Sequence, residues 1–233
     1  MNEYRPKFIS KNQLKVFDID PFKLRGKNFF KTTFQYRKFI FNKEKYRIKS
    51  KKNFFCNLCG FKKGKLFLSW KKKYQLIKCK KCEAVSPNIS FKDEKKFIKA
   101  IYKNKDYIKK TFRYLYKNYS YRKKKFGSER YEYCLKRLKL GKKAKVLDLG
   151  CGMAYFVNYL NSKKIYAKGL EPNEAVADFC KTNLKLNVSS NNLLDEKNSE
   201  YDLITLFDVL EHLKNPAYYL KIINKKLKKN GYC

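Results

Sequence analysis

The chain has 233 residues, of which 43% are hydrophobic, enough to bury the core of one or two domains. It carries 58 lysine and arginine residues against 20 acidic ones, which gives a formal net charge of +38. No apolar run is long enough to span a bilayer, and the first residues lack an apolar signal core, so we expect a cytoplasmic protein.

The positive charge has two readings. A strongly basic surface favours nucleic acid or another anionic partner. Lysine, however, dominates over arginine and is spread over every segment, and Phe, Tyr, Ile and Asn are abundant too, as AT-rich codons would produce. We favour the compositional reading, so nucleic acid is the less favoured partner. The sequence leaves the oligomeric state open.

The first half of the chain holds a cysteine pattern. Residues 1–53 are a basic, aromatic lead-in without a motif, which we expect to be irregular or β-rich. Residues 54–90 contain two C-x-x-C pairs, and the runs 65–70 and 74–78 between them predict a β-hairpin, so the segment is predicted to be a zinc ribbon. The four predicted Zn²⁺ ligands are Cys56, Cys59, Cys79 and Cys82. Disulfides are not expected in an unsecreted chain. The alternative to a metal site is therefore four unrelated free thiols.

Helical periodicity follows the cysteine pairs. Residues 91–128 are predicted to form a helical linker, with Ser90 as the N-cap of its first helix. A further helix is predicted to begin at Ser128 and to end at Leu140, with Gly141 at its C′ position.

From residue 145 onward apolar strands alternate with helical segments, which predicts a doubly wound parallel α/β sheet. The predicted strands are 145–149, 165–170, 186–189 and 202–207, and the predicted helices are 153–162, 174–184 and 216–229. Gly150 and Gly152 follow the first strand, where small residues let the backbone approach a ligand. Glu171 ends the second strand, where an acid in such folds holds ribose hydroxyls.

Three motifs in this order resemble class I S-adenosylmethionine-dependent methyltransferases. They are KVLDLGCG at 145–152, the acid Glu171, and YDLITLF at 201–207 followed by DVLEHLKNP at 208–216. The DVLEHL phrase is similar to that of ubiquinone-type O-methyltransferases. The pattern CxxCG, then YQLIKCKKC and VSPN, resembles the N-terminal ribbon of many bacterial members, so the resemblance spans about residues 54–233. Two positions depart from it: Ala154 and Glu83 stand where Gly is usual.

The resemblance implies a Rossmann-like methyltransferase domain over residues 129–233 with S-adenosylmethionine as cofactor. It implies transfer of a methyl group to a small-molecule or sugar acceptor at oxygen. The implied cofactor-binding residues are Asp148, Gly150, Gly152, Glu171, Asn191, Asn192, Leu193 and Phe207. The implied catalytic residues are His212, as general base, with Glu211 and Asp208 beside it, where the group holds acids and a histidine near the substrate.

Several alternatives stay open at this point. Phe207 fits ordinary core packing as well as cofactor contact, and His212 fits a structural hydrogen bond as well as catalysis. An RNA methyltransferase is a second enzymatic reading, although the N/D-P-P-Y/F phrase of base-amino methyltransferases is missing after the fourth strand. A basic zinc-ribbon module that binds nucleic acid without catalysis is a third.

The resemblance also bears on the end of the chain. Residues 231–233 stand where the fifth strand of the family begins, so we expect a C-terminally truncated domain whose fourth strand, 202–207, lacks a neighbour. Such a half-covered sheet is expected to be poorly stable and to turn over little substrate.

Overall fold

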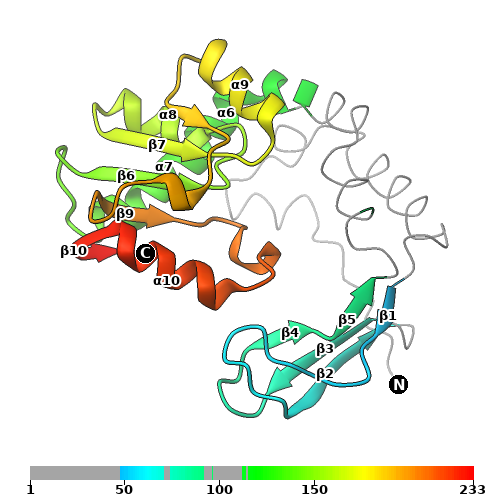
Figure 1. Ribbon diagram of the computed structural model, residues 1–233. Coiled ribbons are helices and arrows are strands. Elements are labelled where there is room, and N and C mark those ends of the chain that lie inside the picture. Colours follow the sequence, from blue (N-terminus) through cyan, green and yellow to red (C-terminus); the bar gives the residue numbers. More distant parts are fainter. Residues whose placement is uncertain (1–47, 71–73, 92–95, 97–111, 114) are drawn as a thin grey trace, which may run out of the picture.

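The computed structural model describes residues 48–70, 74–91, 96, 112–113 and 115–233 (Figure 1). It shows small antiparallel sheets in the first half of the chain and a larger parallel sheet with helices in the second. Predictions for the lead-in up to residue 47 and for most of the linker between 92 and 111 lie outside the described residues. None of the helices in the described part is long and apolar enough to cross a membrane.

Two small sheets carry the cysteine pairs. The first is the pair of β1 (Ile48–Ser50) with β5 (Ile89–Phe91), and the second is β2 (Gly64–Trp70), β3 (Tyr74–Cys79) and β4 (Val85–Pro87), all antiparallel. The predicted hairpin between the cysteine pairs is therefore confirmed. The prediction that Ser90 caps a helix is wrong, because Ser90 pairs with Lys49 inside β5.

The larger sheet has five parallel strands in the order β10-β9-β6-β7-β8, which confirms the predicted doubly wound α/β fold. Its strands are β6 (Lys145–Leu149), β7 (Tyr166–Leu170), β8 (Val188–Ser189), β9 (Tyr201–Thr205) and β10 (Leu227–Tyr232). Its connections hold the helices α8 (Tyr155–Ser162), α9 (Glu174–Thr182) and α10 (Pro216–Lys226), and the single turns η4 (Leu193–Asp195) and η5 (Leu210–His212).

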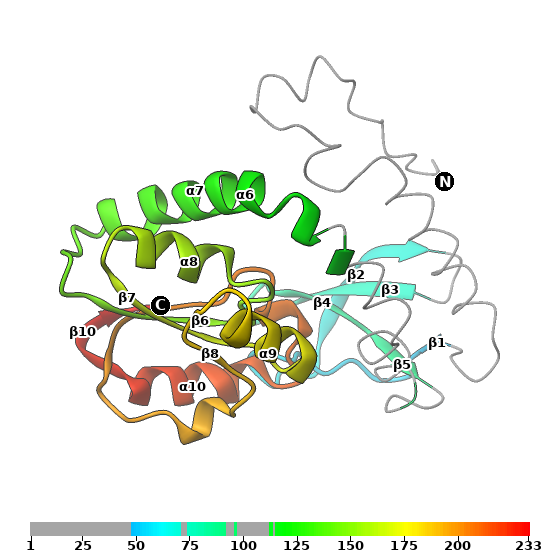
Figure 2. The same ribbon diagram turned by 90° about the horizontal axis from the view of Figure 1, so that it is seen from above.

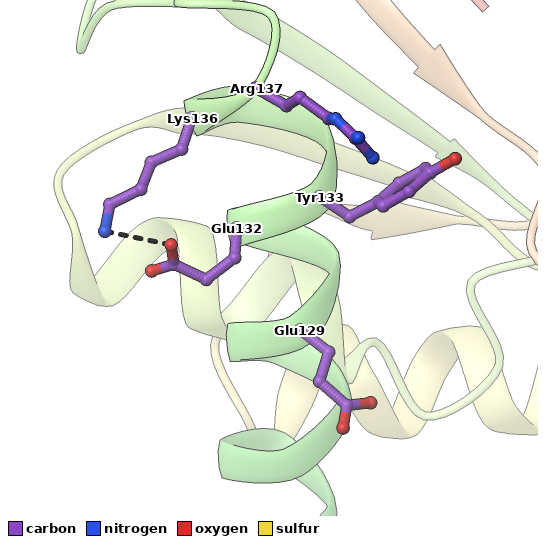
Figure 3. A pocket seen from close by; sticks show the side chains of 5 residues that line it. All are labelled: Glu129, Glu132, Tyr133, Lys136 and Arg137. Carbon is purple, nitrogen blue, oxygen red and sulfur yellow. Dashed lines mark ion pairs between the residues drawn. The ribbon is translucent and has the colours of Figure 1, made fainter.

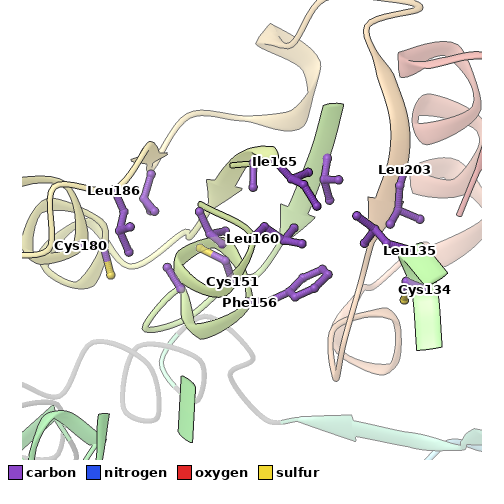
Figure 4. Packing of buried hydrophobic residues seen from close by; sticks show 14 of the residues in the cluster. Cys134, Leu135, Cys151, Phe156, Leu160, Ile165, Cys180, Leu186 and Leu203 are labelled. Carbon is purple, nitrogen blue, oxygen red and sulfur yellow. The ribbon is translucent and has the colours of Figure 1, made fainter. Parts of the chain in front are cut away.

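Helices cover both faces of this sheet (Figure 2). Because side chains alternate along a strand, Val146 points into one core layer and Leu147 into the other. The first layer packs the sheet against α8, α9 and the helix that precedes β6, through residues such as Leu135, Phe156 and Cys180 (Figure 4). The second layer packs it against α10 and η4.

The helix before β6 begins earlier than predicted. A continuous helical run comprises α6 (Tyr119–Arg122), a π-helical segment at Lys123–Gly127, α7 (Ser128–Arg130) and a second π-helical segment at Tyr131–Lys136. Ser128 is therefore an interior residue whose hydroxyl donates to the Lys124 carbonyl, not an N-cap. The helix ends at Lys136, before Leu140, and the left-handed residue after it is Lys139, with φ 54°, not Gly141.

Gly127 explains why this run packs closely on α8. A Cβ built at Gly127 would lie 2.4 Å from the Cβ of Tyr159, so only glycine allows the two helices to approach this closely.

The end of the chain differs from the prediction. The last helix stops at Lys226 instead of 229, and Gly231 is not its C-cap, because Leu227–Tyr232 form β10, which pairs in parallel with β9. The prediction that the fourth strand lacks a neighbour is thus wrong. The Lys228 ammonium lies 2.8 Å from the Asp202 carboxylate at the start of β9, so tertiary contacts outweigh the helix propensity of this lysine-rich stretch.

Candidate functional site

A left-handed glycine turn follows β6. Gly150, Gly152 and Ala154 have φ angles of 63°, 54° and 55°, and Ala154 is the N-cap of α8, so the helix begins two residues later than predicted. A Cβ at Gly150 would lie 2.4 Å from Val209 Cγ2, whereas a Cβ at Gly152 would meet nothing within 4 Å. Gly150 is thus required by the protein's own packing, and Gly152 borders open space that a ligand can fill.

Glu171, directly after β7, stabilises this turn by hydrogen bonds. One of its carboxylate oxygens accepts from the Gly152 amide at 2.9 Å, and the other accepts from the Asn173 amide at 2.9 Å. Burial raises the pKa of Glu171, although these two backbone hydrogen bonds act in the opposite direction. Each oxygen retains a lone pair, so the carboxylate can still accept from hydroxyl groups.

Asp148 is a buried acid with an unused oxygen. Its side chain is 2% exposed, its Oδ1 accepts from the Thr205 hydroxyl at 2.7 Å, and its Oδ2 has no partner within the described part of the chain. Burial raises the pKa of Asp148 to about 6, while the Thr205 hydrogen bond and the charge of Arg130 lower it. An unsatisfied buried carboxylate oxygen is rare, and it marks a place where a donor or cation fits.

The raised pKa of Asp148 makes the free energy of unfolding depend on pH. The native carboxyl keeps its proton up to about pH 6, whereas the unfolded one, with an ordinary pKa of 3.8, loses it earlier. The unfolded state therefore binds fewer protons between these values, and stability falls as pH rises from about 4 to 6, by on the order of 3 kcal/mol.

Urea unfolding of the wild type and of Asp148→Asn at pH 4, 5, 6 and 7 measures this term, because other groups cancel in the difference. We expect the wild type to lose stability relative to Asp148→Asn on going from pH 4 to 7. A difference that stays constant over this range would contradict a raised pKa of Asp148 in the native state.

Phe207 lies just beyond β9, which ends at Thr205, two residues earlier than predicted. Its ring contacts the buried Phe156 edge-on, with a centroid separation of 5.9 Å, and the guanidinium of Arg130 lies 4.0 Å over it. The ring thus packs against the core and also contacts a cation.

The segment 208–212 continues from β9 at the carboxyl edge of the sheet. Asp208, Glu211 and His212 are all exposed, and Asp208 has φ 57°. Val209 lies between Asp208 and η5 and is the residue that a Cβ at Gly150 would strike. The three predicted catalytic side chains therefore belong to a segment that packs on the glycine turn, and their polar groups face solvent.

The three predicted cofactor-binding residues after β8, at 191–193, lie in different environments. Leu193 is 5% exposed and packs in the core layer with α10. The Asn192 side chain accepts from the Leu194 amide at 3.0 Å and caps η4 with Asp195 as its reciprocal partner. Asn191 is exposed. Of these three residues, Leu193 and Asn192 have clear structural roles in the protein alone.

An open hollow of about 550 Å³ lies elsewhere, on the outer surface of the helix before β6 (Figure 3). Its lining includes the ion pair of Glu132 with Lys136, at 2.9 Å, and the exposed ring of Tyr133. None of the predicted site residues lines it, and its charged groups already have partners: Glu132 pairs with Lys136, Glu129 pairs with Lys125, and the Arg137 guanidinium lies over the Tyr133 ring.

The four predicted metal ligands come together in the ribbon. The sulfur atoms of Cys56, Cys59, Cys79 and Cys82 all lie within 4.8 Å of one another. Cys56 and Cys79 are buried, and the Cys56–Cys82 and Cys59–Cys79 sulfurs are each 3.6 Å apart. Four converging thiols are the donor set of a closed structural zinc site, so the residues fit the ion.

Both C-x-x-C turns have the same backbone. The Gly60 amide donates to the Cys56 carbonyl at 3.0 Å, and the Glu83 amide donates to the Cys79 carbonyl at 3.1 Å. Both donors have left-handed φ angles, 74° at Gly60 and 59° at Glu83. Glu83 therefore adopts the conformation that glycine would adopt more easily, as expected from its place in the motif.

Sequence reasoning missed three residues of the site. Thr205 is a polar residue inside an apolar strand, a signal that could have identified it as the donor to Asp148. Arg130 and Val209 reach the site from other elements, and no sequence pattern indicated them.

The comparisons with known proteins bear on the same half of the chain. Residues 120–233 match the sequence profile of the methyltransferase domain family. The chain carries a methyltransferase domain. No curated protein matches the chain.

Solved structures resemble the methyltransferase domain in part. A SAM-dependent methyltransferase from Archaeoglobus fulgidus is 24% identical with a TM-score of 0.37, covering 44% of this chain and 49% of its own. A TehB-like SAM-dependent methyltransferase from Corynebacterium glutamicum is 23% identical with a TM-score of 0.37, covering 49% and 68%. Coclaurine N-methyltransferase, bound to N-methylheliamine and SAH, is 22% identical with a TM-score of 0.35, covering 43% and 31%. The chain thus spans about half the length of the Archaeoglobus protein.

Proposed function

We propose that the protein is an S-adenosylmethionine-dependent methyltransferase that acts on a hydroxyl group of a small molecule or sugar. One observation carries the proposal, beside the family match of residues 120–233. Open space in front of Gly152 lies at the turn that the Glu171 carboxylate holds, and the same turn follows the buried Asp148 with its unused oxygen. Such a constellation fits a ligand that has both hydroxyl and cationic groups.

The cofactor would supply an activated methyl group, so the protein needs only to bind, orient and exclude water. Glu171 would accept from the two ribose hydroxyls. Asp148 would offer its free oxygen to the ammonium of the methionine end, directly or through water. The contacts of Asn191, Asn192 and Leu193 with adenine, and of Phe207 with the cofactor, remain predictions of the resemblance.

Replacing Glu171 with alanine tests the ribose contact. The change removes a charge-assisted acceptor and also frees the Gly152 amide, so S-adenosylmethionine should bind more weakly by about 1.5–3 kcal/mol, roughly ten- to a hundredfold. Calorimetry on the two proteins measures this. The matched control is Glu174→Ala, at the first residue of α9, which should bind as the wild type does. Equal binding by Glu171→Ala would show that this acid does not face the cofactor.

His212 is the proposed general base for the acceptor hydroxyl. It is the single histidine of the chain, and its exposure at the carboxyl edge of the sheet leaves it accessible to an acceptor. Glu211 and Asp208 would orient the acceptor, or they would bind a divalent ion together with His212. These roles rest on the position of the segment against Gly150.

A panel of catechols, phenols and sugars, with S-adenosylhomocysteine release as the readout, tests this role. We expect His212→Ala to lower turnover of an accepted hydroxyl compound by 10²- to 10⁴-fold, with cofactor binding unchanged. A variant that keeps the wild-type rate would assign the histidine a structural role.

We further propose that residues 54–90 form a separate zinc-ribbon domain and residues 129–233 the catalytic domain. The zinc would be structural, because four thiolates close its coordination and leave no position for a substrate.

A further inference from the structure

We propose that the zinc ribbon binds single-stranded RNA on the outer face of its three-stranded sheet, independently of the acceptor. We define this open face by the residues that the strand register places side by side. They are Lys65, Lys78 and Val85 in one cross-strand row and Leu68, Leu76 and Pro87 in the next.

Alternation along the strands separates this face from the metal side. Ile77, Cys79 and Ser86 point the other way and are 8%, 1% and 9% exposed, so β3 and β4 are buried on the metal side. At the edge strand β2, Leu66 shares their row and is 52% exposed. On the open face Leu68 is 44% exposed and Val85 43%, and Pro87 and Lys65 are exposed as well. Within the described residues, the sheet thus has a largely buried metal side and an open face on which exposed apolar side chains stand beside two lysines.

The edge of the sheet adds an aromatic ring. β2 pairs only with β3 among the described strands, and the register shifts between Leu66 and Leu68. Phe67 lies at this irregularity and its side chain is 62% exposed. An exposed ring beside exposed apolar side chains offers a surface on which nucleobases stack.

Charge selects the partner. Residues 51–70 and 74–91 contain eight lysines and one acidic residue, Glu83, whose carboxylate already pairs with Lys78 at 2.9 Å. A second copy of the chain would bring like charges together. Lysines are depleted from the cores of protein–protein interfaces, yet two of these eight, Lys65 and Lys78, stand within the face, as phosphate binding requires. A flexible polyanion with stackable bases therefore fits better than an apolar protein surface.

Fluorescence anisotropy with a labelled 20-nucleotide oligouridine, at several salt concentrations, tests this on the whole chain. The charge variant is Lys63→Glu/Lys65→Glu, which changes Lys65 of the face and Lys63, an exposed residue directly before β2, and the ring variant is Phe67→Leu. The control is Lys221→Glu/Lys225→Glu on the exposed side of α10, which makes the same change in net charge. Zinc content and circular dichroism check that each variant keeps its fold.

We expect the charge variant to bind at least tenfold more weakly with a shallower salt slope, the ring variant about fivefold more weakly, and the control within twofold of the wild type. Equal weakening by the control would reduce the effect to bulk charge and overturn the proposal. So would the absence of binding by the wild type at 100 mM salt. Displacement of the RNA by poly-L-glutamate at equal charge concentration would instead assign the face to acidic protein segments.

Discussion

Gly150→Ala is expected to destabilise the methyltransferase domain, whereas Gly152→Ala is expected to spare its fold and abolish cofactor binding. Both glycines have left-handed φ angles, so each substitution carries a backbone cost of about 1–2 kcal/mol. At Gly150 the added methyl group also strikes Val209 at 2.4 Å, and overpacking of this kind adds about 1–3 kcal/mol. At Gly152 the methyl group enters open space.

The two variants are matched controls for each other, because they share the substitution, the turn and the strained conformation. Urea unfolding should show the larger loss of stability for Gly150→Ala, and calorimetry with S-adenosylmethionine should show no binding by Gly152→Ala at concentrations that saturate the wild type. Wild-type affinity in Gly152→Ala would mean that the space in front of this residue does not hold the cofactor.

Replacing Cys79 and Cys82 together with serine should remove the metal and unfold the ribbon. A structural zinc site of four thiolates contributes about 10–16 kcal/mol of apparent binding free energy, which exceeds the stability of a domain this small. Metal analysis should show about one zinc per chain in the wild type and none in the double variant. Hydrogen exchange in β2 and β3 should rise to the rate of unfolded chain.

The control for this change is Cys233→Ser, which alters an exposed thiol outside the cluster. It should keep the zinc and the exchange protection of the ribbon. Zinc content that stays at the wild-type value in Cys79→Ser/Cys82→Ser would refute the ligand assignment.

Much of the fold could be predicted from local sequence patterns. The strands β6, β7 and β9 were predictable because buried parallel strands are continuous apolar runs, and the hairpin and cysteine cluster were predictable from C-x-x-C spacing. The continuity of the helix through Ser128 was not, since the sequence pattern predicts a new helix that begins at Ser128, whereas Gly127 lies inside the run and packs closely against Tyr159. β10 was not either, because pairing with β9 overrides the helix propensity of Leu227 and its neighbours.

The site residues that belong to sequence motifs could be predicted, and those that reach the site from other elements could not. Motif residues such as Gly152 and Glu171 came from the sequence, and the structure brings them within 2.9 Å of each other. Arg130 and Val209 could not be predicted, since they reach the site through the packing of other elements. The three residues of the 191–193 segment share a motif position but not an environment, because the turn buries Leu193 and leaves Asn191 in solvent.

We infer that the turn between β6 and α8 binds S-adenosylmethionine. The decisive experiment is a calorimetric titration of the whole chain with S-adenosylhomocysteine, the stable product form, with Gly152→Ala titrated in parallel. We expect one molecule bound per wild-type chain and none bound by the variant. A wild-type chain that remains folded and binds no S-adenosylhomocysteine, or a Gly152→Ala variant that binds it equally well, would show that this turn does not hold the cofactor.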